Sequence, residues 1–307
     1  MSLHISRRDS LICLAGTLAA TTLPGTATAK PDALRLDPSR YQTQTVSAGG
    51  QTLAVRAYEN LVYVRHPVDT TYQVMNIYVP EAYFHGQQVG GWTADTAPIF
   101  FPNRIGGYMP ARPGTPQPAT KGPQAGKEST LAAALLQGLV VAAPGARGRT
   151  TQNSAGVYTG KAPSAIIDLK AAVRYLRFNA GVLPGDTEKI VSNGTSAGGA
   201  PSALQGTSAN APDYAPDLAE LGAADARDDI FAVSAYCPIT NLENADAAHE
   251  WQFNGVNEYR KIEMNMLDFN VARKEVSGTL TPAQMQVSNQ LKPLFPAYVN
   301  SLKLRTP

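Results

Sequence analysis

The sequence has few of the residues that cross-link small proteins or hold metals. It contains two cysteines, Cys13 and Cys237, and four histidines. Cys13 lies in a segment that we expect to be removed, so Cys237 remains as a single thiol and no internal disulfide can form. No His/Cys spacing typical of a zinc site occurs, and we predict no metal and no other cofactor. Cys237 ends an apolar run and is interpreted as a small buried hydrophobic residue rather than a nucleophile.

An excess of one charge sign is also missing. The chain has 26 Lys and Arg against 24 Asp and Glu, which gives a formal net charge of +2. Such a balance creates no field that would attract nucleic acid or anionic lipid, so neither is expected as a partner. With 43% apolar residues, the chain can bury a sizeable core as one domain. A small-molecule partner is the expectation that remains.

The start of the chain has the order of an export signal. Arg7 and Arg8 precede an apolar zone at 11–23, and small residues follow at 27–29. The apolar zone is too short to span a bilayer, so no membrane anchor is predicted, although an anchor or a chance basic start is the alternative. The arginine pair resembles the twin-arginine signal of bacteria. We therefore expect residues 1–29 to be cleaved and the rest to reach the periplasm or the exterior.

Hydrophobic patterning after residue 50 indicates an α/β fold. Residues 53–64 and 73–79 alternate apolar with polar side chains, which predicts two antiparallel strands. Short apolar runs then alternate with helical patterns, and this order favours a mostly parallel sheet with helices on both faces. Ligands of such sheets bind at the carboxyl ends of the strands. The predicted buried strands are 99–101, 139–143, 189–191 and 230–235, and the helices are 128–137, 164–178 with Ser164 as N-cap, and 197–205.

The stretch "GTSAG" at 194–198 fits the turn that presents a nucleophilic serine between a strand and a helix. Glycines two residues before and after Ser196 are needed because Cβ atoms have no room in so tight a turn. The turn also aims the amide of Ala197 at negative charge that develops beside the serine oxygen. An ordinary serine in a glycine-rich turn is the alternative. The strand before it and the helix after it favour the catalytic interpretation.

A second loop leaves the same edge of the predicted sheet. Residues 102–108, "PNRIGGY", follow the strand at 99–101. Gly106 and Gly107 allow the backbone to approach a substrate oxygen, so the amide of Gly107 is the candidate partner of the Ala197 amide in an oxyanion hole. A plain turn is the alternative. The Pro- and Gly-rich stretch at 110–126 is expected to be a loop near the mouth of the site.

Several longer stretches resemble one family. "PNRIGGYMP", "ARGRTT", "NGTSAGGA", "DDIFAVSAYCPI" and "EWQFNG" are similar to bacterial tannases, serine esterases of the α/β-hydrolase fold that cleave galloyl esters. The resemblance runs from about residue 53 to the end of the chain. It implies Ser196 as nucleophile, Gly107 and Ala197 as oxyanion donors, and Gly106 and Ile239 against the substrate, with Ile239 packed on its ring. An aryl or galloyl ester is the implied small-molecule substrate.

The resemblance also implies residues that this sequence does not show. An α/β-hydrolase has its triad in the order Ser, acid, His, and of the four histidines only His249 follows Ser196. The family pattern continues with a lid, two further strands, the acid and the histidine. We therefore expect residues 30–307 to be an incomplete hydrolase domain that lacks the last strands, with 245–307 as the start of the lid. His249, oriented by Asp246 or Asp229, is an alternative base, whereas His66 is interpreted as structural.

Three functional readings follow from the sequence. The first is a serine esterase of galloyl-type esters that works through an acyl-enzyme, present as its N-terminal part without the triad acid and histidine. The second is a non-catalytic remnant that binds polyphenols or a partner chain. The third is a complete esterase that uses His249. A general carboxylesterase, a peptidase or a lipase on the same turn also stays open because one fold supports many acyl transfers.

Overall fold

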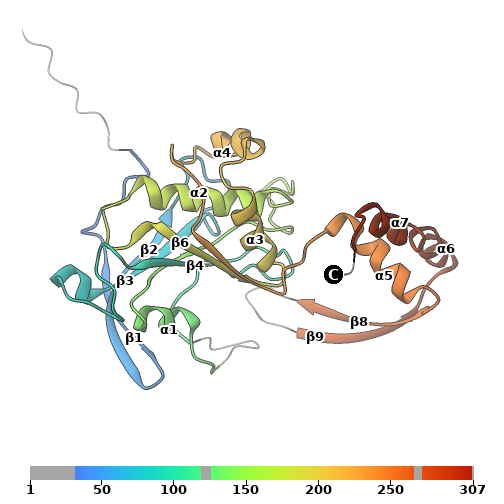
Figure 1. Cartoon of the computed structure of the whole chain (residues 1–307), viewed down its shortest axis with the longest axis horizontal. Helices are drawn as coiled ribbons and strands as arrows, with labels where there is room; N and C mark the ends of the chain where they lie inside the picture. The colour runs from blue at the N-terminus through green and yellow to red at the C-terminus, as the bar shows by residue number, and fades with distance from the viewer. Residues whose placement is uncertain (1–31, 119–125, 266–271, 306–307) are drawn as a thin grey trace, which may run out of the picture. The chain divides into compact units, whose positions relative to one another are not determined.

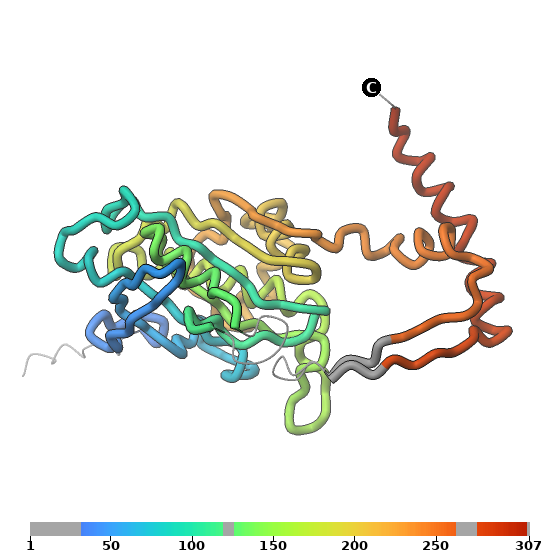
Figure 2. Tube along the Cα trace, turned by 90° about the horizontal axis from the view of Figure 1, so that it is seen from below, coloured from blue at the N-terminus to red at the C-terminus, as the bar shows by residue number. Residues whose placement is uncertain are grey.

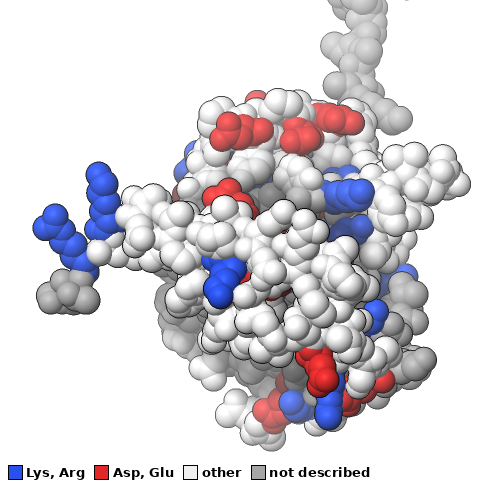
Figure 3. Space-filling view, turned by 90° about the vertical axis from the view of Figure 1, so that its right-hand side faces the viewer, with Lys and Arg blue, Asp and Glu red and all other residues white. Residues whose placement is uncertain are grey.

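The computed structural model describes residues 32–118, 126–265 and 272–305, and residues Ala33–Pro307 form one compact unit. The predicted export signal at 1–29 and part of the predicted loop at 110–126 lie outside the described residues. None of the helices in the described part is long and apolar enough to cross a membrane. Lys, Arg, Asp and Glu are scattered among uncharged residues on the face shown in Figure 3.

A seven-stranded sheet forms the centre of the unit, in the order β1-β2-β3-β5-β4-β6-β7 (Figure 1). The strands on the β1 side pair antiparallel, and β5, β4, β6 and β7 run parallel to one another. This arrangement confirms the predicted α/β class. The strands are β1 Gln42–Ala48, β2 Gln51–Val62, β3 Val74–Pro80, β4 Pro98–Pro102, β5 Val140–Pro144, β6 Asp186–Thr195 and β7 Ala232–Tyr236.

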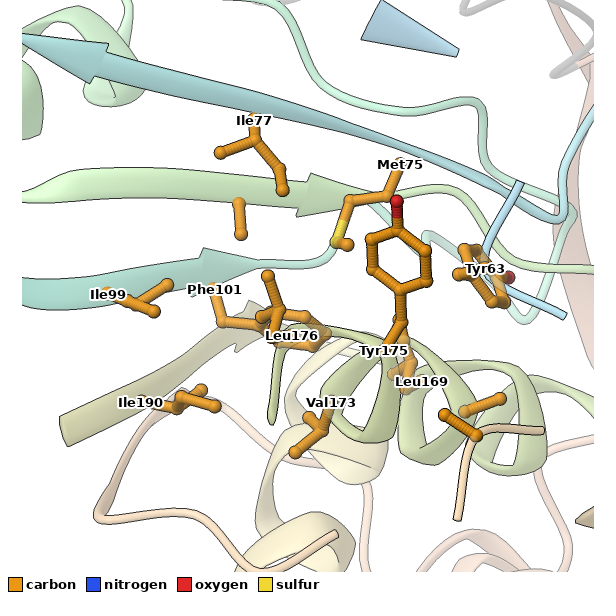
Figure 4. Close-up of a cluster of buried hydrophobic side chains, with 14 of the residues drawn as sticks. Tyr63, Met75, Ile77, Ile99, Phe101, Leu169, Val173, Tyr175, Leu176 and Ile190 are labelled. Atoms are coloured by element: carbon orange, nitrogen blue, oxygen red, sulfur yellow. The ribbon is translucent and has the colours of Figure 1, made fainter. Parts of the chain in front are cut away.

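Helices cover both faces of this sheet, as the sequence predicts. On one face α1 (Thr130–Leu136) packs on a cluster that includes Val55, Tyr78 and Val141. On the other face α2 (Ser164–Phe178) contributes Leu169, Val173, Tyr175 and Leu176 to the larger core. Figure 4 shows these helix side chains facing Met75, Ile77, Ile99, Phe101 and Ile190 of the strands. Beside α2, α3 (Gly199–Thr207) contacts β6 and β7.

The α2 helix has the predicted bounds but a different start. Ser164 is its first residue rather than its N-cap, and the cap position belongs to Pro163 without a side-chain hydrogen bond. The hydroxyl of Ser164 instead donates to the carbonyl oxygen of Thr159 at 3.1 Å. The predicted cap was therefore wrong because the serine hydroxyl ties down the preceding loop.

The predicted buried strand at 230–235 is a half-exposed strand. β7 is the last strand in the order of the described sheet, so only one of its edges is paired. Phe231 is 67% exposed and Tyr236 is 59% exposed. The prediction that Cys237 is buried is wrong for the same reason, because this cysteine follows β7 and is exposed.

The region after 240 contains a polar ribbon and a group of helices. β8 (Glu258–Asn265) and β9 (Ala272–Thr279) pair antiparallel and lie side by side in Figure 2. The charged residues of β8 and β9 concealed these strands from an apolar pattern search. The remaining elements are η1 Glu81–His85, η2 Pro212–Tyr214, α4 Ala215–Glu220, η3 Leu242–Asn244, α5 Ala245–Phe253, α6 Pro282–Leu291 and α7 Leu294–Ser301.

Candidate functional site

Ser196 occupies the turn between β6 and α3. Its φ of 58° lies in the left-handed region, which costs a non-glycine residue about 1–3 kcal/mol. Two hydrogen bonds hold this conformation: the Ser196 amide donates to Tyr236 O at 2.9 Å, and its carbonyl oxygen accepts from the Ala200 amide at 3.2 Å. The residue is exposed. The sequence prediction of a serine raised on a constrained turn therefore matches the local geometry.

The two glycines of the turn are required by close contacts. A Cβ on Gly194 would overlap the carbonyl group of Gly198. A Cβ on Gly198 would lie 2.5 Å from Asn103 Oδ1 and 2.6 Å from the Ile105 carbonyl oxygen. The loop after β4 thus packs directly on the backbone of the serine turn, and this packing is possible only without side chains at both positions.

That loop carries the second candidate donor. β4 and β6 are neighbours in the sheet (Figure 1). Their carboxyl ends therefore bring the start of the loop at 103–109 against the turn that carries Ser196. Gly107 is exposed with a φ of 57°. The loop is tied to a third segment because the Arg149 amide donates to Tyr108 O at 2.8 Å.

The amides of Gly107 and Ala197 have no hydrogen-bond acceptor within the described ranges. Ala197 is nevertheless fully buried, at 0% exposed. A buried backbone N–H without an acceptor costs free energy, so such groups are rare in folded proteins. Free amides near a candidate nucleophile are the arrangement that stabilises an oxyanion, and the role of Gly107 and Ala197 as its donors stays a prediction.

A largely apolar pocket of about 700 Å³ adjoins the turn. Ser196 is not on its lining, but the lining includes Tyr108 next to Gly107, Ala200 one turn after Ser196, and the predicted ring contact Ile239. Arg149 and the first turn of α2 close other sides. Pockets of about 300–1,000 Å³ hold drug-sized molecules, so this one is large enough for an aromatic ester. Gly106, predicted beside the substrate, lies in the adjoining loop and is not on the lining.

Tyr108 lines this pocket, but its hydroxyl does not reach the pocket surface. Its hydroxyl is buried and has no hydrogen-bond partner among the described residues. Burial raises the pKa of the Tyr108 phenol, so the group stays protonated at neutral pH. Because this oxygen is buried, it is not open to a ligand in the pocket.

The described histidines contact other groups. His66 Nδ1 lies 3.2 Å from Glu220 O, as expected for a structural histidine, and His85 Nε2 lies 3.1 Å from Glu81 Oε1. The ring of His249 packs on Phe253 with centroids 4.9 Å apart. Among residues that the structure describes, no side chain forms a hydrogen bond with Ser196 Oγ. The predicted alternative base, His249, is therefore not brought to the serine by any described contact.

The acidic partners suggested for His249 are also placed elsewhere. Asp229 pairs with Arg227 at 2.9 Å and with Arg177 at 3.3 Å. Asp246 lies in the first turn of α5. No cluster of three or more His, Cys, Asp or Glu that could hold a metal occurs in the described part of the chain.

Sequence reasoning missed two groups that support the site. Arg147 and Asp168 form a buried ion pair at 2.8 Å, which holds the loop that binds Tyr108 O. A signal was available, because Asp168 is a charge inside the apolar pattern "IIDLKAAV" of α2. Asn103 was also missed. A lone asparagine after a strand gives no sequence signal beyond its place in the loop.

Comparison with known proteins identifies relatives of the whole described fold. The BD-FAE family model matches residues 121–297. A tannase from Fusobacterium nucleatum is 53% identical with a TM-score of 0.80, and the match covers 88% of this chain and 57% of that one. A tannase from Lactobacillus plantarum is 45% identical with a TM-score of 0.80, over 89% of this chain and 58% of that one.

A tannin acyl hydrolase in complex with ethyl gallate is 46% identical with a TM-score of 0.78, over 89% of this chain and 57% of that one. No curated protein sequence is significantly similar. The chain spans less than three fifths of the length of each of these solved structures. The matches confirm the predicted resemblance to bacterial tannases and the α/β-hydrolase fold.

Proposed function

The chain belongs to the BD-FAE family of α/β-hydrolases, and on that premise we propose that it carries the nucleophile and oxyanion hole of a serine esterase for aryl, galloyl-type esters. One observation supports this most directly. Ser196 is exposed on a left-handed turn, and the candidate donor amides beside it have no described acceptor.

The proposed chemistry is acyl transfer in two steps. Ser196 Oγ attacks the ester carbonyl carbon, and its proton passes to a base. The carbonyl oxygen becomes an oxyanion that accepts hydrogen bonds from the Ala197 and Gly107 amides. Loss of one such donor typically raises the barrier by about 3 kcal/mol. Collapse of the adduct breaks the bond to the alcohol oxygen, which takes the proton back from the base, and water then hydrolyses the acyl-Ser196 ester by the same route.

Aryl esters are favoured over other acyl compounds by the pocket and by the relatives. Solved tannin acyl hydrolases hold ethyl gallate and 3,4-dihydroxybenzoate. In this chain the pocket is largely apolar, and Ile239 on its lining offers an apolar contact to a ring. A general carboxylesterase would not need such a contact.

A second candidate is binding without turnover. A serine hydroxyl is a weak nucleophile until a base removes its proton, and none of the described histidines contacts Ser196. The same pocket would then bind a polyphenol and release it unchanged.

The deciding experiment compares the wild-type chain with Ser196→Ala. The control is Ser47→Ala, because Ser47 is an exposed serine on β1. Release of gallate from methyl gallate is followed by chromatography, and gallate binding by calorimetry. The esterase proposal expects turnover that Ser196→Ala abolishes and Ser47→Ala preserves. Equal turnover in all three proteins would refute it, and equal gallate affinity without turnover would establish the binding function.

We also propose that residues 1–29 direct export. The test replaces Arg7 and Arg8 with lysines and measures the protein in periplasmic and cytoplasmic fractions of a bacterial host. Export through the twin-arginine route predicts retention in the cytoplasm, and unchanged export of the variant would exclude that route.

A further inference from the structure

Asn103 connects the two loops that carry the candidate donors. It follows β4 directly and is only 8% exposed. Its side-chain amide nitrogen lies 3.1 Å from Asn193 O, 3.0 Å from Gly198 O and 2.8 Å from Ser202 Oγ. Its side-chain oxygen accepts from the Ile105 amide at 3.3 Å. One side chain therefore contacts the end of β6, the start of α3 and its own loop.

The contacts of Asn103 lie next to both candidate donors in the chain. Gly198 directly follows Ala197, and Ile105 precedes Gly107 by two residues. Asn103 Oδ1 also occupies the space beside Gly198, since a Cβ there would approach it to 2.5 Å. The asparagine amide thus fills the gap that the glycine leaves, and it fixes how closely the loop at 103–109 approaches the serine turn.

The carbonyl groups that the Asn103 side chain contacts also accept hydrogen bonds from backbone amides. The Asn103 amide donates to Asn193 O at 2.9 Å, and the Ser202 amide donates to Gly198 O at 3.2 Å. Both carbonyls therefore keep a partner when the Asn103 side chain is removed. A truncated side chain leaves the β4–β6 pairing and α3 intact and frees mainly the loop.

We propose that Asn103 is a positioning residue that sets the separation of the Gly107 and Ala197 amides, and this rests on the proposed esterase function. Oxyanion donors act at about 2.7–3.1 Å, and a displacement of about 1 Å can cost roughly 100-fold in rate. Asn103 does not line the substrate pocket, although Tyr108 of the same loop does, so we expect only a small change in substrate binding beside a larger fall in rate.

The test compares Asn103→Ala with the control Ser202→Ala. Ser202 is also fully buried, and its removal deletes one Asn103 contact while leaving those to Asn193 and Gly198. On methyl gallate, Asn103→Ala is expected to lower kcat about 100-fold with KM within threefold of wild type. Ser202→Ala is expected to keep kcat within threefold. A loss of folded protein alone would not change kcat per folded molecule.

Hydrogen exchange supplies a readout that needs no activity. Asn103→Ala is expected to speed exchange of the amides of Ile105 and Met109 relative to wild type and Ser202→Ala. The proposal fails if kcat per folded molecule stays within threefold, or if exchange of the loop is unchanged. An inactive wild-type protein would refute the esterase function, and the exchange comparison would then decide the inference alone. If Asn103→Ala does not fold, the near-isosteric Asn103→Leu replaces it with the same criteria, because leucine lacks both the donor and the acceptor of the asparagine side chain.

Discussion

Replacement of Gly198 by alanine tests the packing of the two site loops. Gly198 is the N-cap of α3 with φ −73° and ψ −28°, a conformation open to any residue. From the backbone alone, Gly→Ala at a compatible site stabilises a protein by about 0.4–1 kcal/mol. The contacts oppose this gain, because the new Cβ would lie 2.5 Å from Asn103 Oδ1 and 2.6 Å from Ile105 O.

The size of the effect follows from the movement that the contact requires. Nonbonded atoms settle at about 3.5 Å, so the loop at 103–109 must retreat by about 1 Å. Insertion of a methyl group into a packed site costs about 2 kcal/mol and the backbone gain is about 0.7 kcal/mol, which leaves a net loss of about 1.3 kcal/mol. At about 2–4 °C per kcal/mol for a domain of this size, the unfolding midpoint Tm is expected to fall by about 3–5 °C. The same movement shifts Gly107 and lowers kcat roughly 100-fold.

Gly206→Ala is the matched control on the same helix. Its Cβ would lie 2.6 Å from Val233 Cγ2 and 3.9 Å from the next atom. Gly206 is exposed, and Val233 is 38% exposed on the edge of the sheet, so the valine can turn away. We expect this variant to change the unfolding free energy by less than about 0.5 kcal/mol and to keep the wild-type kcat.

Thermal unfolding followed by circular dichroism and initial rates on methyl gallate measure both variants. A Gly198→Ala protein with a Tm and kcat at or above wild type would refute the packing argument. Equal losses in both variants would show that α3 rather than the loop is responsible.

Three further predictions concern other parts of the structure. Lys170 is 0% exposed and lies 2.8 Å from the Asp228 carboxylate, so Asp228→Asn leaves a buried cation without its counter-charge. We expect the free energy of unfolding, measured in urea at pH 7, to fall by about 3–5 kcal/mol. Burial opposes ionisation of Asp228, but Lys170 and Arg174 outweigh it and lower its pKa. The pair therefore stabilises the fold above about pH 4 and loses this effect as pH falls further, so wild type should be more acid-sensitive there than the variant. Tyr108→Phe removes a buried hydroxyl that has no partner among the described residues, so it should raise the unfolding free energy in urea by about 1 kcal/mol, and a loss of stability would show that this hydroxyl has a partner. Thr281→Ala removes the capping box of α6 and should cost about 1 kcal/mol with kcat unchanged, so a loss of kcat would link α6 to the site.

The sequence predicted the parts of the fold in which side-chain periodicity and burial coincide. The α2 pattern gave the correct bounds because one face of this helix packs on the sheet over its whole length. β1 and the β8–β9 ribbon were missed because their side chains are mostly polar. Burial of Cys237 was mispredicted because an apolar run does not tell whether a strand is covered on both faces.

The candidate site was predictable only where a local motif carries its geometry. The turn at Ser196 is encoded within five residues, so it could be located from sequence. The contact of Asn103 with Gly198 joins residues that are 95 positions apart, and it exists because β4 lies between β5 and β6 in the sheet. Such a contact depends on strand order, which no short pattern specifies.

Acyl transfer needs a nucleophile with an oxyanion hole and a base that takes the proton. The described residues offer candidates for the first but no contact that supplies the second. The donor amides and the exposed hydroxyl of Ser196 are held by backbone contacts, and these need no histidine. An oxyanion hole and substrate binding alone retain roughly 10³- to 10⁴-fold acceleration over water. His66, His85 and His249 contact other groups, so none of them adds proton transfer in this arrangement. The rate itself is therefore diagnostic, because an acceleration well above roughly 10⁴-fold requires a base at Ser196 that the described contacts do not provide.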